Sequence, residues 1–199
     1  MTLRADLAAI ADAVPFGARI LDVGCGDGAL LAALRADKGV DGRGIELSGA
    51  NVAAAVARGL SVVQGDADAD LADYPDDAFD MAILSNTLQA MRAPADVLGE
   101  LLRIARAAVV SFPNFGHWRV RAALGLRGRM PVTRLLPIGW YETPNIHLCT
   151  IADFRALAAA QRLHVDTAVY LRGGQPVGPF AANLLAEQAV FVLRRATER

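Results

Sequence analysis

The sequence is poor in cysteine and lysine. Cys25 and Cys149 are the only cysteines among 199 residues, and they form no C-x-x-C pattern, so we expect neither a disulfide framework nor a metal site. Such sparse cysteine suits a reducing cytoplasm, where we place the protein. Lys38 is the only lysine. The chain therefore lacks the Tyr-x-x-x-Lys pair that a NAD-dependent reductase would need, which excludes that class.

The chain also lacks a long apolar run. None reaches the roughly 18 residues of a membrane-spanning helix, and Asp6 stands where a secretory signal would have its apolar stretch. Basic and acidic residues number 20 and 21, for a net charge of −1, so the overall charge indicates neither a nucleic-acid nor a membrane partner. With 54% hydrophobic residues, we expect one soluble domain over residues 1–199.

Strand-length apolar runs alternate with helix-length amphipathic stretches, which is typical of a parallel sheet covered by helices. The pattern predicts strands at residues 19–23, 42–47, 60–64, 79–84 and 107–112, and helices at 28–37, 50–58 and 94–104.

Residues 113–149 interrupt this alternation. They hold four prolines, two tryptophans and two histidines, which predicts an irregular insertion between the fifth strand and the next helix. Thr150 and Asp153 have the spacing of a helix capping box, and segments 163–171 and 188–193 predict a closing antiparallel pair of strands. We expect an α/β fold with a mostly parallel, seven-stranded sheet, an antiparallel last strand and helices on both faces.

A glycine-rich turn follows the first predicted strand. Gly24, Gly26 and Gly28 come after Asp22 and precede a helix, which lets the backbone approach a ligand closely and points a helix N-terminus at it. The dinucleotide fingerprint is G-x-G-x-x-G, and here the third glycine comes one residue earlier. Asp-x-Gly-x-Gly-x-Gly resembles motif I of the class I S-adenosylmethionine (SAM) methyltransferases. The resemblance implies their Rossmann-like fold, SAM or S-adenosylhomocysteine as cofactor, and a place for Asp22 at its methionine end.

Polar residues also follow the next three strands. Glu46 closes the second strand, where a carboxylate can accept hydrogen bonds from both ribose hydroxyls of an adenosyl group. Asp66 stands where enzymes of this kind contact the adenine amino group, and Ser85 lies beside the expected methyl group. Singly, each is explained by a turn, a strand-end acid or a helix cap, but the ordered set predicts one crevice. The predicted cofactor site comprises Asp22, Gly24, Cys25, Gly26, Gly28, Glu46, Leu47, Asp66, Ala67 and Ser85.

Several irregular segments resemble one branch of this superfamily, the methionine biosynthesis protein MetW family. They are Gln64-Gly65-Asp66 and residues 84–90 (LSNTLQA), 111–121 (SFPNFGHWRVR), 128–133 (GRMPVT) and 143–150 (TPNIHLCT). The resemblance implies a role in methionine synthesis together with MetX, the homoserine O-acyltransferase. It implies no particular methyl acceptor.

The insertion contains the residues that could assist a methyl transfer. A poor nucleophile needs a base within about 3 Å of its proton, and the candidates are His117, Tyr141, Glu142 and His147. The alternative for both histidines is a hydrogen bond that locks an irregular loop. The Asn/Asp-Pro-Pro-Tyr motif of enzymes that methylate nucleic-acid amino groups is absent.

In this part of the chain the arginines are not balanced by acidic residues. No acidic residue occurs from Leu101 to Tyr141. Arg103 and Arg106 suit a solvated helix face, but five arginines lie in the insertion among Trp, Met, Leu and Pro, a composition suited to a protein interface. These five are Arg119, Arg121, Arg127, Arg129 and Arg134. Nucleic-acid binding is the weaker alternative, because the chain is slightly acidic.

Two functions remain open. In the first, which the family resemblance favours, the protein is a non-catalytic subunit that docks on the acyltransferase through residues 113–149. SAM, which is made downstream in the pathway, then shifts the equilibrium between the free and the docked protein. In the second, which the motifs alone favour, the protein is a methyltransferase for an unidentified small acceptor, assisted by His117 or Tyr141.

Overall fold

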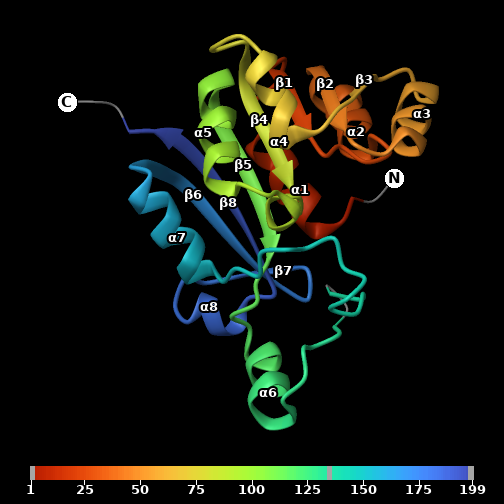
Figure 1. Cartoon of the computed structure of the whole chain (residues 1–199). Coiled ribbons are helices and arrows are strands. Elements are labelled where there is room, and N and C mark those ends of the chain that lie inside the picture. The colour runs from red at the N-terminus through yellow and green to blue at the C-terminus, as the bar shows by residue number, and fades with distance from the viewer. Residues whose placement is uncertain (1–2, 134–135, 197–199) are drawn as a thin grey trace.

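The computed structural model describes residues 3–133 and 136–196. Within these ranges one sheet has the strand order β3-β2-β1-β4-β5-β8-β6-β7 (Figure 1). The strands are β1 (Arg19–Val23), β2 (Asp41–Glu46), β3 (Ser61–Gln64), β4 (Phe79–Ser85), β5 (Ala105–Pro113), β6 (Leu163–Arg172), β7 (Gln175–Val177) and β8 (Gln188–Arg195). The helices are α1 (Ala5–Ala13), α2 (Ala29–Lys38), α3 (Gly49–Ala57), α4 (Ala67–Asp70), α5 (Pro94–Ile104), α6 (Trp118–Arg127), α7 (Ile151–Ala160) and α8 (Ala182–Leu185), with short 3₁₀ turns η1 (Leu71–Asp73) and η2 (Leu88–Ala90).

The first five strands are parallel, as predicted. Their register brings the carboxyl ends of the strands to one edge of the sheet, because Glu46 pairs with Gln64 and Ser85 pairs with Ser111. Polar residues that follow these strands therefore lie along a common edge.

Helices cover both faces of the sheet, as predicted (Figure 1). Side chains alternate along each strand, so on β1 Leu21 packs in one core cluster with α5 and α7, whereas Ile20 packs in another with α1 and α2. In the first cluster the rings of Phe112 and Phe191 stack with centroids 5.9 Å apart. The two cores hold the edge of the sheet as a rigid platform for the loops.

The sheet has eight strands where seven were predicted. β6 and β8 are antiparallel, as expected, and the extra strand, β7, continues from β6 through Gly173 and Gly174. These two glycines have φ of +57° and +81°, which suits a two-residue hairpin turn. Pro176 is tolerated because β7 is the last strand of the sheet and lies at its edge.

Four helices lie where none was predicted. α1 precedes β1, the short α4 and α8 follow β3 and β7, and α6 lies inside the insertion, which is therefore not irregular throughout. α6 begins after His117 and ends at Gly128, whose φ is +61°, a common helix stop. Only Val120 of α6 is buried, so the sequence of this helix shows little of the apolar periodicity from which a helix is predicted. The capping box of Thr150 and Asp153 is present at α7, as predicted.

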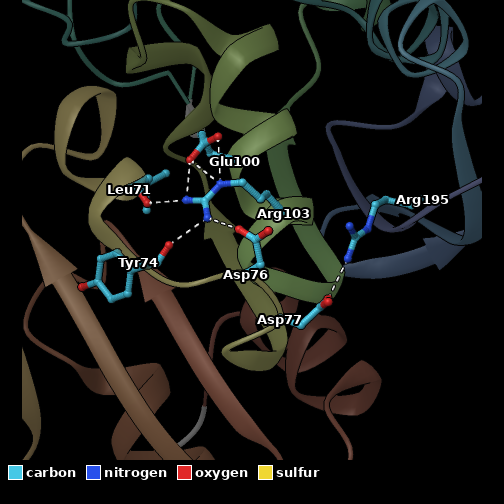
Figure 2. A network of polar contacts seen from close by, with 7 residues as sticks. All are labelled: Leu71, Tyr74, Asp76, Asp77, Glu100, Arg103 and Arg195. Carbon is cyan, nitrogen blue, oxygen red and sulfur yellow. Dashed lines mark hydrogen bonds and ion pairs between the residues drawn. The ribbon is translucent and has the colours of Figure 1, made fainter.

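Arg103 is not the solvated residue of a helix face that the sequence suggested. Its guanidinium donates to the carbonyl oxygens of Leu71 and Tyr74 at 3.1 and 2.8 Å and pairs with Glu100 at 2.7 Å (Figure 2). It also pairs with Asp76. Arg103 thus ties η1 and the following loop to α5. Within the described residues, no helix is long and apolar enough to span a membrane.

Candidate functional site

The glycine loop connects β1 to α2 and is held against the end of β2. The N–H of Gly24 donates to the carbonyl of Ile45 at 2.8 Å, and the N–H of Gly26 donates to Oε2 of Glu46 at 2.8 Å. The loop is thereby anchored at the carboxyl edge of the sheet.

The three glycines of the loop serve different purposes. A Cβ on Gly28 would lie 2.4 Å from Leu60, and one on Gly24 would lie 2.6 Å from Oγ1 of Thr87, so both are needed for packing within the protein. A Cβ on Gly26 would meet no atom within 4 Å. Gly26 is therefore the glycine of this loop that leaves room for a ligand.

Asp22 is buried beneath this loop with an unsatisfied oxygen. The residue is 2% exposed, and its Oδ1 has no hydrogen-bond partner. Burial, together with the nearby charge of Glu46, raises the pKa of Asp22 from 3.8 to about 7. A buried acceptor without a donor is costly, so this carboxyl group fits a ligand that brings an ammonium or N–H group.

Glu46 is already engaged by the protein. Besides Gly26, its carboxylate accepts from the N–H of Ser48 at 2.9 Å and from Nδ2 of Asn51 at 3.3 Å. A carboxylate offers about four acceptor positions. As it stands, Glu46 retains capacity for about one ribose hydroxyl rather than the two that the sequence suggested.

Asp66 caps α4 and forms an ion pair. Its Oδ1 accepts from the N–H of Asp68 at 3.0 Å, and its Oδ2 lies 3.2 Å from the guanidinium of Arg92.

Leu47, which follows β2, is 67% exposed. A planar apolar group such as a purine could therefore lie on Leu47 without displacing any core contact.

A cleft of about 430 Å³ lies beside the glycine loop. Its lining includes five of the predicted residues: Asp22, Gly24, Cys25, Gly26 and Ser85. The other five predicted residues, Gly28, Glu46, Leu47, Asp66 and Ala67, do not line it.

Cys25 is a small, buried residue here, and its Sγ fills the space above Gly44. Burial raises the pKa of its thiol to about 12, so a reactive thiolate is not expected.

Part of the cleft lining was missed by the sequence reasoning. It includes Leu3 and Arg4, which precede α1, Leu7 in α1, and Asn86, which follows β4. The side chain of Asn86 donates to Oδ2 of Asp6 at 2.8 Å, which ties α1 to the end of β4. The spacing of Leu3, Leu7, Ile10 and Val14 is the helical signal that could have identified α1.

His117, one of the three predicted catalytic candidates, lines a cavity. The residue is 5% exposed, and burial lowers its pKa, which favours the neutral ring. Its Nδ1 accepts the N–H of Arg119 at 3.3 Å, so Nε2 carries the proton. In this tautomer Nε2 is a hydrogen-bond donor, and Nδ1, the nitrogen that could act as a base, is engaged with Arg119. His117 lines a cavity of about 260 Å³ together with Glu187.

The other candidates lie elsewhere. Tyr141 is 72% exposed, and Glu142 is exposed beside it. Nε2 of His147 lies 3.3 Å from the carbonyl oxygen of Arg92, while the N–H of His147 donates to the carbonyl of Gln89 at 2.9 Å. His147 therefore anchors the end of the insertion to η2 and the following loop.

A third cavity of about 610 Å³ lies between the cleft and the His117 cavity. It shares Arg4 and Asn86 with the cleft, and Pro113, Gly173 and Glu187 with the His117 cavity. The three cavities are therefore neighbours along one edge of the sheet. Among the described side chains no group of three His, Cys, Asp or Glu residues could hold a metal ion.

The strand order, the antiparallel β8 and the glycine loop after β1 define the class I SAM-dependent methyltransferase fold. A SAM-dependent methyltransferase from Mesorhizobium loti superposes with a TM-score of 0.71 at 20% identity, covering 96% of this chain and 98% of that one. One from Archaeoglobus fulgidus gives 0.69 at 13% identity, with 95% and 92% covered. The [4+2]-cyclase SpnF gives 0.68 at 19% identity, with 98% and 81% covered.

Within this class, the chain belongs to the methionine biosynthesis protein MetW family, whose model matches residues 4–193. A bifunctional methionine biosynthesis protein MetXA/MetW from Rhodopirellula baltica is 35% identical over 207 aligned positions, which cover 98% of this chain. The chain spans 33% of that relative's length.

Proposed function

We propose that this protein is a SAM-binding subunit that regulates a homoserine O-acyltransferase in methionine biosynthesis. The observation that carries the proposal is the relative in which a MetW portion and a MetXA portion form one chain. Fusion suits two proteins that act together, because the linker raises the effective concentration of each for the other. We expect this chain to make the same association with its acyltransferase.

The cofactor part of the proposal is supported by the cleft. Its volume of about 430 Å³ is within the usual range for ligand sites. Asp22 would receive the ammonium of the methionyl group, Gly26 would allow close approach of the backbone, and Ser85 would lie on the far side. Glu46 and Leu47 do not line the cleft, but they lie at the end of β2, against the glycine loop, where they would contact the ribose and the adenine. When bound, SAM supplies an electrophilic methyl group and a positive charge.

SAM acts as a regulator only if it binds the free and docked states with different affinity. A fivefold to hundredfold difference needs only about 1 to 3 kcal/mol of coupling. The structure offers a connection between the two regions. Arg92 pairs with Asp66 through its side chain and contacts His147, at the end of the insertion, through its carbonyl oxygen.

The deciding experiment measures homoserine acylation by the acyltransferase of the same organism. The rate is compared with and without this protein, and SAM is added to half of each set. We expect the protein to raise the rate and SAM to change the increase. If the protein never changes the rate, the regulatory role is refuted.

A methyltransferase acting on a small acceptor is the second candidate. The observation that favours it is the 610 Å³ cavity that shares Arg4 and Asn86 with the cleft, because an acceptor there would lie next to the cofactor. However, Nδ1 of His117, the nitrogen that could act as a base, is engaged with Arg119, and the fold by itself does not specify methyl transfer. An extract incubated with labelled SAM and this protein tests it, since a labelled metabolite is required.

A further inference from the structure

The helix α6 has almost no support from the rest of the described protein. Of its ten residues only Val120 is buried, and Figure 1 shows α6 projecting beyond the carboxyl edge of the sheet. An isolated helix of this length is marginal in water, and Gly125 weakens it further. A helix of this kind gains most of its stability from a surface that packs against it.

An apolar groove runs along α6. It has a volume of about 680 Å³ and lies between the helix and the segment 129–133 that follows it. Trp118, Leu126, Met130 and Val132 line it, with exposed fractions of 42%, 86%, 36% and 65%. Apolar side chains this exposed and this close together are characteristic of a binding surface.

Positive charge surrounds this groove. Arg119, Arg127 and Arg129 line it, all three are exposed, and none forms an ion pair among the described residues. The guanidinium of Arg119 lies 5.3 Å from the centre of the Trp118 ring. Since the sequence has no acidic residue from Leu101 to Tyr141, the charge here is not balanced locally.

We propose that the α6 groove receives an acidic, amphipathic segment of the acyltransferase, an inference that rests on the proposed function. Apolar side chains of that segment occupy the groove beside Trp118 and Leu126, and its carboxylates face Arg127 and Arg129. Charge complementarity selects this occupant. A second copy of the chain docking through the same face would instead bring arginines against arginines, which is unfavourable.

The test measures binding kinetics of the full chain on immobilised acyltransferase at several NaCl concentrations. The double variant Arg127→Ala/Arg129→Ala should weaken binding at least fivefold, mainly through slower association, and should flatten the salt dependence. Leu126→Ser should weaken binding through faster dissociation and leave the salt dependence unchanged. SAM affinity should stay the same in every variant, because the cleft is lined by other residues.

Two exposed residues at the opposite edge of the sheet provide matched controls. Arg106→Ala removes a positive charge at the start of β5, and Phe16→Ser removes an apolar side chain before β1 that is 78% exposed. Both controls should bind the acyltransferase as the wild type does. A circular dichroism spectrum of each variant verifies that the chain is folded.

The outcomes separate the groove from the proposed function. If the wild type binds and the groove variants bind equally well, the groove assignment is overturned and the regulatory function stands. If the wild type neither binds the acyltransferase nor alters its rate, the proposed function fails first. Dimerisation of the wild type that Leu126→Ser abolishes, or tight binding to a duplex oligonucleotide that the arginine variant abolishes, would identify another occupant and overturn the assignment.

Discussion

Oε2 of Glu46 accepts a hydrogen bond from the backbone N–H of Gly26 at 2.8 Å, across 20 residues of sequence. The carboxylate at the end of β2 therefore supports the glycine loop, and in the proposed function it also contacts the ribose of SAM. Changes at Glu46 should consequently affect both the stability of the protein and its affinity for SAM.

Glu46→Ala removes the acceptor for Gly26, Ser48 and Asn51. We expect SAM binding to weaken at least roughly tenfold and the free energy of unfolding to fall by about 1 to 3 kcal/mol, since each of the three hydrogen bonds contributes about 1 kcal/mol net. Calorimetric titration and urea unfolding measure the two effects. Glu46→Gln, which keeps one acceptor oxygen, should lie between the variant and the wild type. Unchanged SAM affinity in Glu46→Ala would refute the placement of the ribose.

The variants Gly26→Ala and Gly28→Ala distinguish a glycine that leaves room for the ligand from a glycine that is needed for packing within the protein. All of Gly26, Gly28 and Gly59 have positive φ, so alanine should cost each about 1 kcal/mol of backbone strain. Gly28→Ala should cost more, because its Cβ would lie 2.4 Å from Leu60. Gly26→Ala should lose the most SAM affinity, whereas Gly59→Ala, with no atom within 4 Å of its Cβ, should lose none. Thermal unfolding and SAM titration would contradict this if Gly26→Ala and Gly59→Ala bound SAM alike.

The carboxyl group of Asp22 should make stability depend on pH. Its pKa is about 7 in the folded protein against 3.8 ordinarily, so between these values the native state binds more protons than the unfolded chain. Stability attributable to Asp22 is therefore greatest near pH 4 and falls as pH rises toward 7. Urea unfolding should show the wild type losing stability from pH 5 to pH 8 relative to Asp22→Asn, by at most a few kcal/mol.

The same ionisation should affect SAM binding. A cationic group on the ligand stabilises the charged form of Asp22, so wild-type affinity should rise from pH 6 to pH 8 in a calorimetric titration. A SAM affinity that does not change between pH 6 and pH 8 would contradict this prediction. In the urea experiment, parallel stability curves for the wild type and Asp22→Asn would show that Asp22 is not the group that titrates.

Asp66→Ala removes the N-cap of α4 and the partner of Arg92. The loss of a cap should lower stability by about 1 kcal/mol, and SAM affinity should fall because the predicted acceptor for the adenine amino group is lost. Thr150→Ala is the matched control, since it removes the N-cap of α7. It should show a similar loss of stability by thermal unfolding with unchanged SAM affinity. Equal SAM affinity in both variants would count against the adenine assignment.

Much of the fold was predictable because its signals are local. The parallel strands follow from apolar runs, and α5 was predicted with the bounds Pro94–Ile104 that it has, since a proline suits its first turn. The capping box at Thr150 needs only residues three positions apart. In contrast, β7 was missed because a three-residue edge strand depends on the hairpin turn at Gly173 and Gly174.

The candidate site also has features that the sequence predicts and features that only the structure reveals. The sequence by itself determined the glycine loop, the acid of β1 and the polar residues at the strand ends, because turn geometry and strand order place these at one edge. Only the tertiary structure decided that α1 contributes to the lining of the cleft, next to the contact of Asn86 with Asp6 across 80 residues. It likewise decided that Glu46 holds the glycine loop through Gly26, 20 residues away, and that His117 is buried. Contacts between distant segments and the burial of a polar ring depend on packing, which no local pattern of residues encodes.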